Sequence, residues 1–207
     1  MKKIVCISDT HGQHRSLNLP EGDILIHAGD ISRVGKLNEI IEFNSWLGTL
    51  NYKHKIIIAG NHDFIFENEY NLAKSLITNA IYLEDSGVEI EGIKFWGSPV
   101  SPRFYDWAFN RDRGEDIKKH WDKIPKNIDV LITHGPPYGV LDKTVSGENV
   151  GCEDLLSKIQ EIKPKFSIFG HIHEGYGIFK DKGITFINAC SLNERYKIKH
   201  DPIVFEI

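Results

Sequence analysis

Two histidines one residue apart, His171 and His173, follow the apolar run 166–169 near the end of the chain. This run reads as a buried strand that ends at Gly170. Imidazole nitrogens are common ligands for divalent metals, but one such pair proves little. The pair becomes informative because four other apolar runs are also followed by side chains that can bind a metal.

These four runs deliver carboxylate, carboxamide or imidazole groups. Asp9 and His11 follow the run 4–7, Asp30 follows 23–26, Asn61 and His62 follow 56–59, and His134 follows 129–132. Ligands of open α/β sheets bind at the carboxyl ends of the strands, so we expect these side chains to meet.

The pooled set of candidate metal ligands contains oxygen and nitrogen donors and no thiol. It comprises Asp9, His11, Asp30, Asn61, His134, His171 and His173. These donors suit Mn, Fe, Co or Zn better than they suit a Cys-rich structural zinc. Seven ligands are too many for one such ion but fit two ions that share a carboxylate. Two cations about 3.5–4 Å apart are a known device for phosphoryl transfer.

Each of these residues also has an ordinary interpretation. Asp9 suits a turn, His11 suits a surface, and Asn61 tolerates the left-handed conformation of a turn. The spacing of Asp9 and His11, in extended backbone, would point both side chains to the same side. Five strand ends that all carry such groups favour the metal interpretation.

The elements that must position these groups are strands alternating with helices, followed by hairpins. We predict strands at 3–7, 23–27, 55–59, 81–83, 129–133 and 166–169, hairpins at 88–97 and 176–188, and a last edge strand at 202–207. Helical spacing of apolar residues predicts helices near 34–50, 70–77, 117–124 and 155–162. This mixture indicates an α/β fold with two packed mixed sheets and helices outside.

The segment 98–114 is a long aromatic and basic loop, and such loops in compact domains are often functional. An aromatic side chain here could stack on a base, and Arg103 or Arg111 could bind a phosphate. The alternative is a solvated charged edge over a packed Trp107.

Length, composition and charge limit the number of domains, the partners and the location of the protein. A chain of 207 residues with 41% hydrophobic and 26% charged residues is typical of one globular domain, residues 1–207. The net charge of −4 argues against binding to extended nucleic acid. Three scattered cysteines predict reduced thiols and a cytoplasmic location. Neither a secretory leader nor a membrane-spanning run is recognisable, so no membrane partner is expected. The sequence indicates no oligomeric state.

The motifs taken together are similar to those of the calcineurin-like metallophosphoesterase superfamily. They are Asp-x-His at 9–11, Gly-Asp at 29–30, Gly-Asn-His-Asp at 60–63, Thr-His-Gly at 133–135 and Gly-His-x-His at 170–173. The strings 7–14, 107–110, 133–137 and 171–177 resemble its small metallophosphoesterase-domain subgroup, which is associated with cyclic-nucleotide phosphodiesterase activity. The resemblance implies a four-layer αββα sandwich and a hydrolase with two divalent ions, manganese before Fe, Co or Zn.

The resemblance also implies a role for each residue. Asp9, His11 and His173 would hold one metal, Asn61, His134 and His171 the other, and Asp30 would bridge them. A hydroxide between the metals would attack a small phosphoester, a cyclic nucleotide or another small diester, in line with the leaving oxygen. His62 would protonate that oxygen as a general acid.

One position departs from the superfamily pattern. Many relatives carry an aspartate three residues after Asp30 that orients the catalytic histidine, but this chain has Arg33. Asp63 or a backbone carbonyl would then orient His62, or His62 would be a weaker acid, and Arg33 could contact substrate phosphate instead.

A phosphomonoesterase or protein phosphatase and an inactive scaffold remain as alternative functions. The string 29–33 does not match the fuller protein-phosphatase signature, and a scaffold predicts missing ligands, whereas all seven are present.

Overall fold

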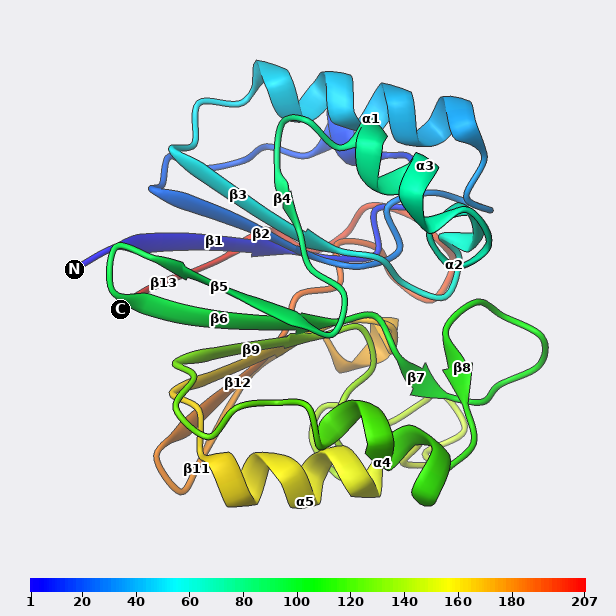
Figure 1. The fold of residues 1–207 in the computed structure, drawn as a ribbon, viewed down its shortest axis with the longest axis vertical. Helices are drawn as coiled ribbons and strands as arrows, with labels where there is room; N and C mark the ends of the chain where they lie inside the picture. Colours follow the sequence, from blue (N-terminus) through cyan, green and yellow to red (C-terminus); the bar gives the residue numbers. More distant parts are fainter.

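The computed structural model describes residues 1–207 as two mixed sheets packed face to face between two layers of helices (Figure 1). The first sheet has the order β13 (Ile203–Glu206), β1 (Lys3–Ile7), β2 (Ile24–Ala28), β3 (His54–Ile58) and β4 (Ile81–Tyr82). The second has the order β11 (Gly177–Asp181), β12 (Ile184–Asn188), β10 (Phe166–Phe169), β9 (Val130–Thr133), β6 (Ile93–Ser98) and β5 (Ser86–Ile90). The predicted sandwich of two mixed sheets is confirmed.

The helices cover the outer faces of the two sheets. On the first sheet lie α1 (Leu37–Thr49), α2 (Phe64–Asn68) and α3 (Tyr70–Leu76), and on the second lie α4 (Glu115–Trp121) and α5 (Glu153–Ile162) (Figure 1). Two 3-10 turns, His14–Ser16 and His173–Gly175, and the short pair β7 (Ser101–Pro102) and β8 (Asn110–Arg111) complete the chain.

Strand alternation divides the apolar residues between separate cores. In β1, Ile4 and Cys6 belong to the core between the two sheets, whereas Val5 and Ile7 belong to the core under α1. A third core lies between the second sheet and its helices and contains Trp121. Because successive side chains of a strand point to opposite faces, both faces of β1 are apolar and buried.

Parallel strands place the site at one side of the molecule. β1 to β4 are parallel to one another, as are β6, β9, β10 and β12. The carboxyl ends of these strands lie on the side that carries β7 and β8, and both chain termini lie on the opposite side (Figure 1). The polar residues that follow the strands therefore come together.

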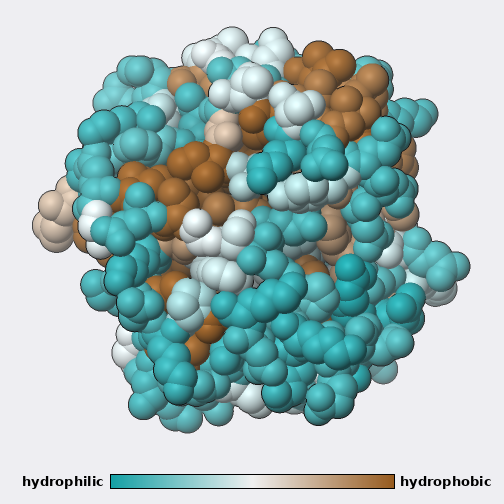
Figure 2. All heavy atoms as spheres, in the orientation of Figure 1, coloured by the Kyte–Doolittle hydropathy of each residue, from teal (hydrophilic) through white to brown (hydrophobic).

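The prediction for the first helix requires a correction. The helix begins at Leu37, so Val34 lies before it, and its buried residues are Ile40, Phe43, Trp46 and Leu47. Leu37 and Ile41, two of the apolar residues whose helical spacing predicted this helix, are 45% and 49% exposed. Apolar spacing alone predicted too wide a buried face, and Figure 2 shows an apolar patch at the upper right, over the start of α1.

The short helix α2 and the pair β7–β8 were not predicted, because elements of two to five residues carry too little periodicity. All three cysteines are buried and free. No helix has both the length and the apolar character that crossing a bilayer requires.

Candidate metal and catalytic site

Four of the seven candidate ligands have a left-handed backbone conformation. The φ angles are 53° at Asp9, 43° at His11, 54° at Asp30 and 69° at His171. Residues other than glycine adopt this region at a cost of order 1 kcal/mol or more, and such residues cluster at functional sites. The turns after the strands are therefore shaped around these side chains.

These φ angles correct two expectations about the backbone, one for Asp9 and His11 and one for Asn61. Asp9 and His11 do come together, but through left-handed turns and not through extended backbone. Asn61 was the residue for which a left-handed turn had been considered, and its φ is not positive.

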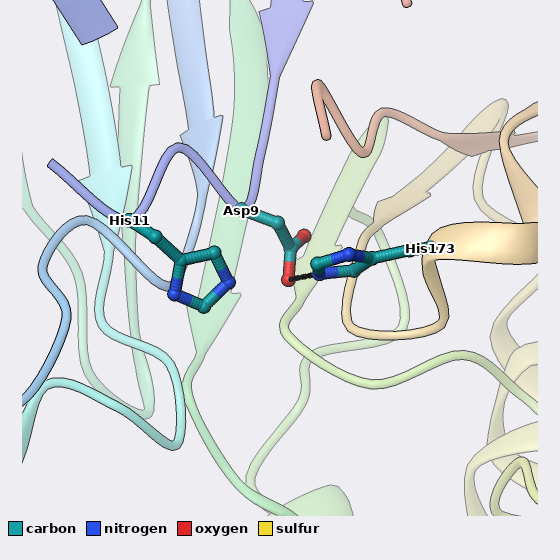
Figure 3. A group of neighbouring side chains, drawn as sticks. All are labelled: Asp9, His11 and His173. Carbon is teal, nitrogen blue, oxygen red and sulfur yellow. Dashed lines mark ion pairs between the residues drawn. The ribbon is translucent and has the colours of Figure 1, made fainter. Parts of the chain in front are cut away.

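Asp9, His11 and His173 form the first group, with ligand atoms within 4.8 Å of one another. The Asp9 carboxylate lies between the two imidazoles, and its Oδ1 is 3.5 Å from Nε2 of His173 (Figure 3). His173 comes from a segment more than 160 residues further along the chain, so folding alone assembles this group.

Asp30, His134 and His171 form the second group, again with ligand atoms within 4.8 Å. The two oxygens of Asp30 face different histidines. Oδ1 lies 3.4 Å from Nε2 of His134, and Oδ2 lies 3.6 Å from Nε2 of His11. Asp30 thus stands between the two groups.

Asn61 joins the second group through its side-chain oxygen, which lies 2.8 Å from Nε2 of His134. Backbone carbonyls hold the opposite ring nitrogens of two histidines. Nδ1 of His134 lies 3.0 Å from the oxygen of Ala28, and Nδ1 of His173 lies 2.8 Å from that of Asn193. Such bonds fix the ring orientation of metal-binding histidines and leave Nε2 for the metal.

Two glycines of the motifs make room for the carboxylates. A Cβ atom on Gly60 would collide with Oδ1 of Asp30, and one on Gly170 would collide with Oδ2 of Asp9. The site therefore requires glycine at both positions for space, whatever their φ angles.

The residues present fit divalent metal ions. Both ring nitrogens of His11 are buried without a hydrogen-bond partner, which is costly unless another group binds them. The surrounding donors are carboxylate and amide oxygens and imidazole nitrogens, a set that suits divalent transition metals.

The carboxylates and histidines polarise one another. Burial would raise the pKa of Asp30, but the charge and hydrogen bond of His134 and the charge of His11 together outweigh it and hold the pKa well below its usual range. Burial would lower the pKa of His134, but the charge and hydrogen bond of Asp30, the charge of Asp9 and the Ala28 carbonyl together raise the pKa to about 9. Burial, followed by the charge of His134, lowers the pKa of His171 to about 4. Ionised carboxylates are ready to bind cations, and metal binding would release the proton of His134.

His62 lies beside the two groups and points into the site. Its Nε2 is 4.0 Å from Oδ2 of Asp30, and its Nδ1 is 2.7 Å from the carbonyl oxygen of Arg33. The backbone of Arg33 thus orients the ring, which is the second of the two possibilities considered for this departure from the family pattern.

Asp63 has a different place from the one considered for it. Its carboxylate accepts hydrogen bonds from the backbone N–H groups of Ile31, Ser32 and Gly60 at 2.8–3.1 Å and from the Ser32 hydroxyl at 2.6 Å. Asp63 therefore ties the loop of Asp30 to the loop of Asn61 and does not orient the His62 ring. Burial, with the nearby Asp30 charge, raises its pKa to about 6.

A cavity of about 550 Å³ opens next to these groups. Its wall includes Asp30, Asn61, His62, His171 and His173, together with Arg103, Phe104, Tyr105, Trp107 and Tyr196. The segment 98–114 therefore supplies part of the cavity wall. This lining agrees with the aromatic interpretation of the loop, and the packed Trp107 with its paired arginines agrees with the alternative.

The three candidate substrate-binding arginines differ. Arg103 lines the cavity and pairs with Asp112 at 2.6 Å. The guanidinium of Arg111 contacts Glu67 and the carbonyl of Asn110 and does not line the cavity. The Arg33 side chain does not line it either, since this residue serves the site through its carbonyl. The geometry supports a substrate contact only for Arg103.

Sequence reasoning missed two neighbours of the site. Tyr196 packs on His11 and His173 with ring centroids 4.9 and 5.2 Å apart. The Cys190 thiol lies 3.1 Å from Oδ2 of Asp9. Neither residue belongs to one of the motifs quoted above. A third neighbour, Trp107, stacks on His62 at 4.1 Å; the sequence singled out its segment but not this contact.

Comparison with known proteins agrees with the motifs. The chain is 41% identical to the human Metallophosphoesterase domain-containing protein 1 over 99% of this chain and 71% of the relative. It is 40% identical to the UPF0046 protein K07C11.7 of Caenorhabditis elegans over 99% and 75%. The crystal structure of TT1561 of Thermus thermophilus superposes with a TM-score of 0.62 at 12% identity, covering 90% of this chain and 88% of that one, which shows a shared fold.

The family model described as calcineurin-like phosphoesterase matches residues 2–175. This range contains every residue of the two groups. The chain therefore belongs to the calcineurin-like phosphoesterase family, which indicates hydrolysis of phosphoesters with bound metal.

Proposed function

We propose that this protein hydrolyses a small phosphodiester with two divalent metal ions. The observation that carries the proposal is the position of Asp30, whose two oxygens face His134 of one group and His11 of the other. Asp9, His11 and His173 would hold one ion, Asn61, His134 and His171 the other, and Asp30 both. Bound divalent ions lower the pKa of water and neutralise the charge of phosphate oxygens.

His62 supplies the proton for the leaving oxygen in this proposal. Its Nδ1 donates to the Arg33 carbonyl, so Nε2 is the nitrogen that faces the site beside Asp30. A positioned general acid of this kind is worth about 10²–10⁴-fold in rate. No serine or cysteine nucleophile is required, and we expect no covalent intermediate.

The charges around the cavity favour a diester over a monoester. A monoester carries two negative charges near neutral pH, so beyond the proposed metal ions it would gain from a free cationic side chain in the cavity. Arg113 lines the cavity, but its guanidinium contacts the carbonyls of Val150 and Gly151 and the carboxylate of Glu153. Arg103 is paired with Asp112. A singly charged diester needs less compensation than the monoester.

The aromatic wall favours a substrate with a flat group. Phe104 and Tyr105 line the cavity, are 58% and 75% exposed, and touch each other with centroids 4.5 Å apart. Bases stack on such side chains. A cyclic nucleotide, a substrate with one charge and one base, fits both sides of the cavity.

A substrate panel with added manganese tests the proposal. It compares bis-p-nitrophenyl phosphate, p-nitrophenyl phosphate, and 2′,3′- and 3′,5′-cyclic nucleotides, with a chelator as control. We expect cleavage of the diesters, little cleavage of the monoester and no activity with the chelator. Preferred cleavage of the monoester would indicate a phosphatase, and a folded, manganese-loaded protein that cleaves nothing would indicate an inactive scaffold.

A further inference from the structure

The indole of Trp107 lies face to face with the imidazole of His62. The ring centroids are 4.1 Å apart and the planes are inclined by 27°. On another side, the ring of His11 meets His62 edge-on at 4.5 Å and 81°. The His62 ring is thus enclosed between a flat aromatic face and a candidate metal ligand.

A histidine side chain has two rotatable bonds, so one hydrogen bond does not fix it. The bond from Nδ1 to the Arg33 carbonyl sets the direction in which Nε2 points, but it still permits the ring to tilt about that bond. The stack on Trp107 restricts this remaining freedom, because paired aromatic rings prefer defined mutual orientations.

The segment that carries Trp107 is itself firmly anchored. The next residue, Ala108, is fully buried, and its N–H donates to the carbonyl of Asn61 at 3.1 Å. Phe109 is 2% exposed and packs in the core under α1 with a φ of 58°. A bulky residue with a positive φ is a genuine outlier. Such a strained conformation persists only where the surrounding structure holds it in place.

We propose that Trp107 is a positioning residue that fixes the ring plane of His62 toward the leaving oxygen. The inference rests on the proposed function, in which His62 is the general acid. It gives the segment 98–114 a second role besides forming the cavity wall, since this segment connects the second sheet to the loop of Asn61 and His62.

A double-mutant cycle on His62 and Trp107 tests this role. The two substrates are bis-p-nitrophenyl phosphate, whose leaving group needs no proton, and a 2′,3′-cyclic nucleotide, whose alkoxide does. We expect Trp107→Leu to reduce kcat for the cyclic nucleotide by up to about 100-fold, the scale of a misplaced catalytic group, and to change kcat for the aryl ester little. Trp107→Phe, which keeps a flat face, should restore most of the rate.

In the His62→Ala background, Trp107→Leu should add no further loss, because residues that act through one another are not additive. Phe104→Ala is the matched control, since Phe104 lines the same cavity from the same segment. Phe104→Ala should reduce kcat by the same factor in the wild-type and the His62→Ala backgrounds. An equal loss from Trp107→Leu with and without His62 would mean direct contact with substrate and would overturn the inference.

A structural readout keeps the inference separate from the proposed function. In the zinc-loaded protein, the ring protons of His62 should be shielded by the indole, and Trp107→Leu should shift their NMR signals downfield. If the signals do not move, the inference fails even if the enzyme is active. If they move but no phosphoester is cleaved, the proposed function fails and the stacking contact stands.

Discussion

Nδ1 of His62 lies 2.7 Å from the backbone carbonyl oxygen of Arg33. The position at which many family members carry an aspartate therefore still orients the histidine, but through its main chain. Because every residue has a carbonyl, the identity of the side chain at position 33 is free to change. We expect Arg33→Ala to keep the metals and most of the activity, which metal analysis and steady-state kinetics check. A loss of leaving-group protonation in Arg33→Ala would show that the guanidinium takes part.

The effect of His62 on the rate of cleavage should depend on whether the leaving group needs a proton. We expect His62→Ala to retain both metals and to slow the cleavage of an alkoxide-leaving diester about 10²–10⁴-fold. Cleavage of bis-p-nitrophenyl phosphate should fall much less, because p-nitrophenolate leaves without a proton. Rates measured for both substrates check this, and an equal loss for both would remove His62 as the acid.

Asp63 should act on stability and on the arrangement of both loops. Asp63→Ala leaves the buried N–H groups of Ile31, Ser32 and Gly60 without their shared acceptor. Each unsatisfied group costs about 1–3 kcal/mol, so we expect a loss of at least roughly 3 kcal/mol in the free energy of unfolding. Asp63→Asn keeps one carbonyl oxygen and should lose less. Urea denaturation of the two variants measures the difference, and an unchanged midpoint for Asp63→Ala would contradict the role.

Gly170 should be required for the position of Asp9. A methyl group at residue 170 would overlap Oδ2 of Asp9 and the Ser8 side chain. We expect Gly170→Ala to weaken metal binding at least about tenfold, the lower end of the effect of altering groups that support ligands. Gly92→Ala is the control, because a Cβ atom there meets no neighbour, although its φ of 83° adds local strain. Isothermal titration with manganese compares the two, and wild-type affinity in Gly170→Ala would refute the spatial argument.

His27 should make the metal-free protein sensitive to acid. Burial outweighs the nearby Asp9 charge and lowers the pKa of His27 from 6.5 to about 3. Below pH 6.5 the His27 imidazole binds a proton in the unfolded chain but stays neutral in the native protein. The free energy of unfolding therefore falls as the pH drops toward 3 and then levels off. Between pH 6.5 and pH 5 this amounts to about 2 kcal/mol.

The measurement compares wild type with His27→Gln in urea at several pH values, with a chelator present. The amide that His27→Gln introduces can still face the Thr10 hydroxyl, which lies 2.9 Å from Nε2 of His27. The variant should lose less stability on acidification than the wild type. Parallel curves for wild type and His27→Gln would contradict the prediction.

The sequence was sufficient for the strands of the two large sheets and for the grouping of the seven polar residues. Runs such as 4–7 and 56–59 are apolar and β-branched, so they are recognisable as buried strands, and parallel strands bring their carboxyl ends together. The same reasoning could not give the left-handed turn at Asp9, the Arg33 carbonyl on His62 or the stack of Trp107. These depend on contacts between segments distant in the chain, and periodicity carries no information about them.

Metal stoichiometry tests the central claim most directly. We predict that the wild-type chain, saturated with manganese and freed of excess ion, carries two equivalents, and that Asp30→Ala, which removes the carboxylate facing both His11 and His134, carries fewer than one. A folded wild-type protein with one equivalent or none, or an Asp30→Ala variant that retains two, would contradict the account of a site built around a shared carboxylate.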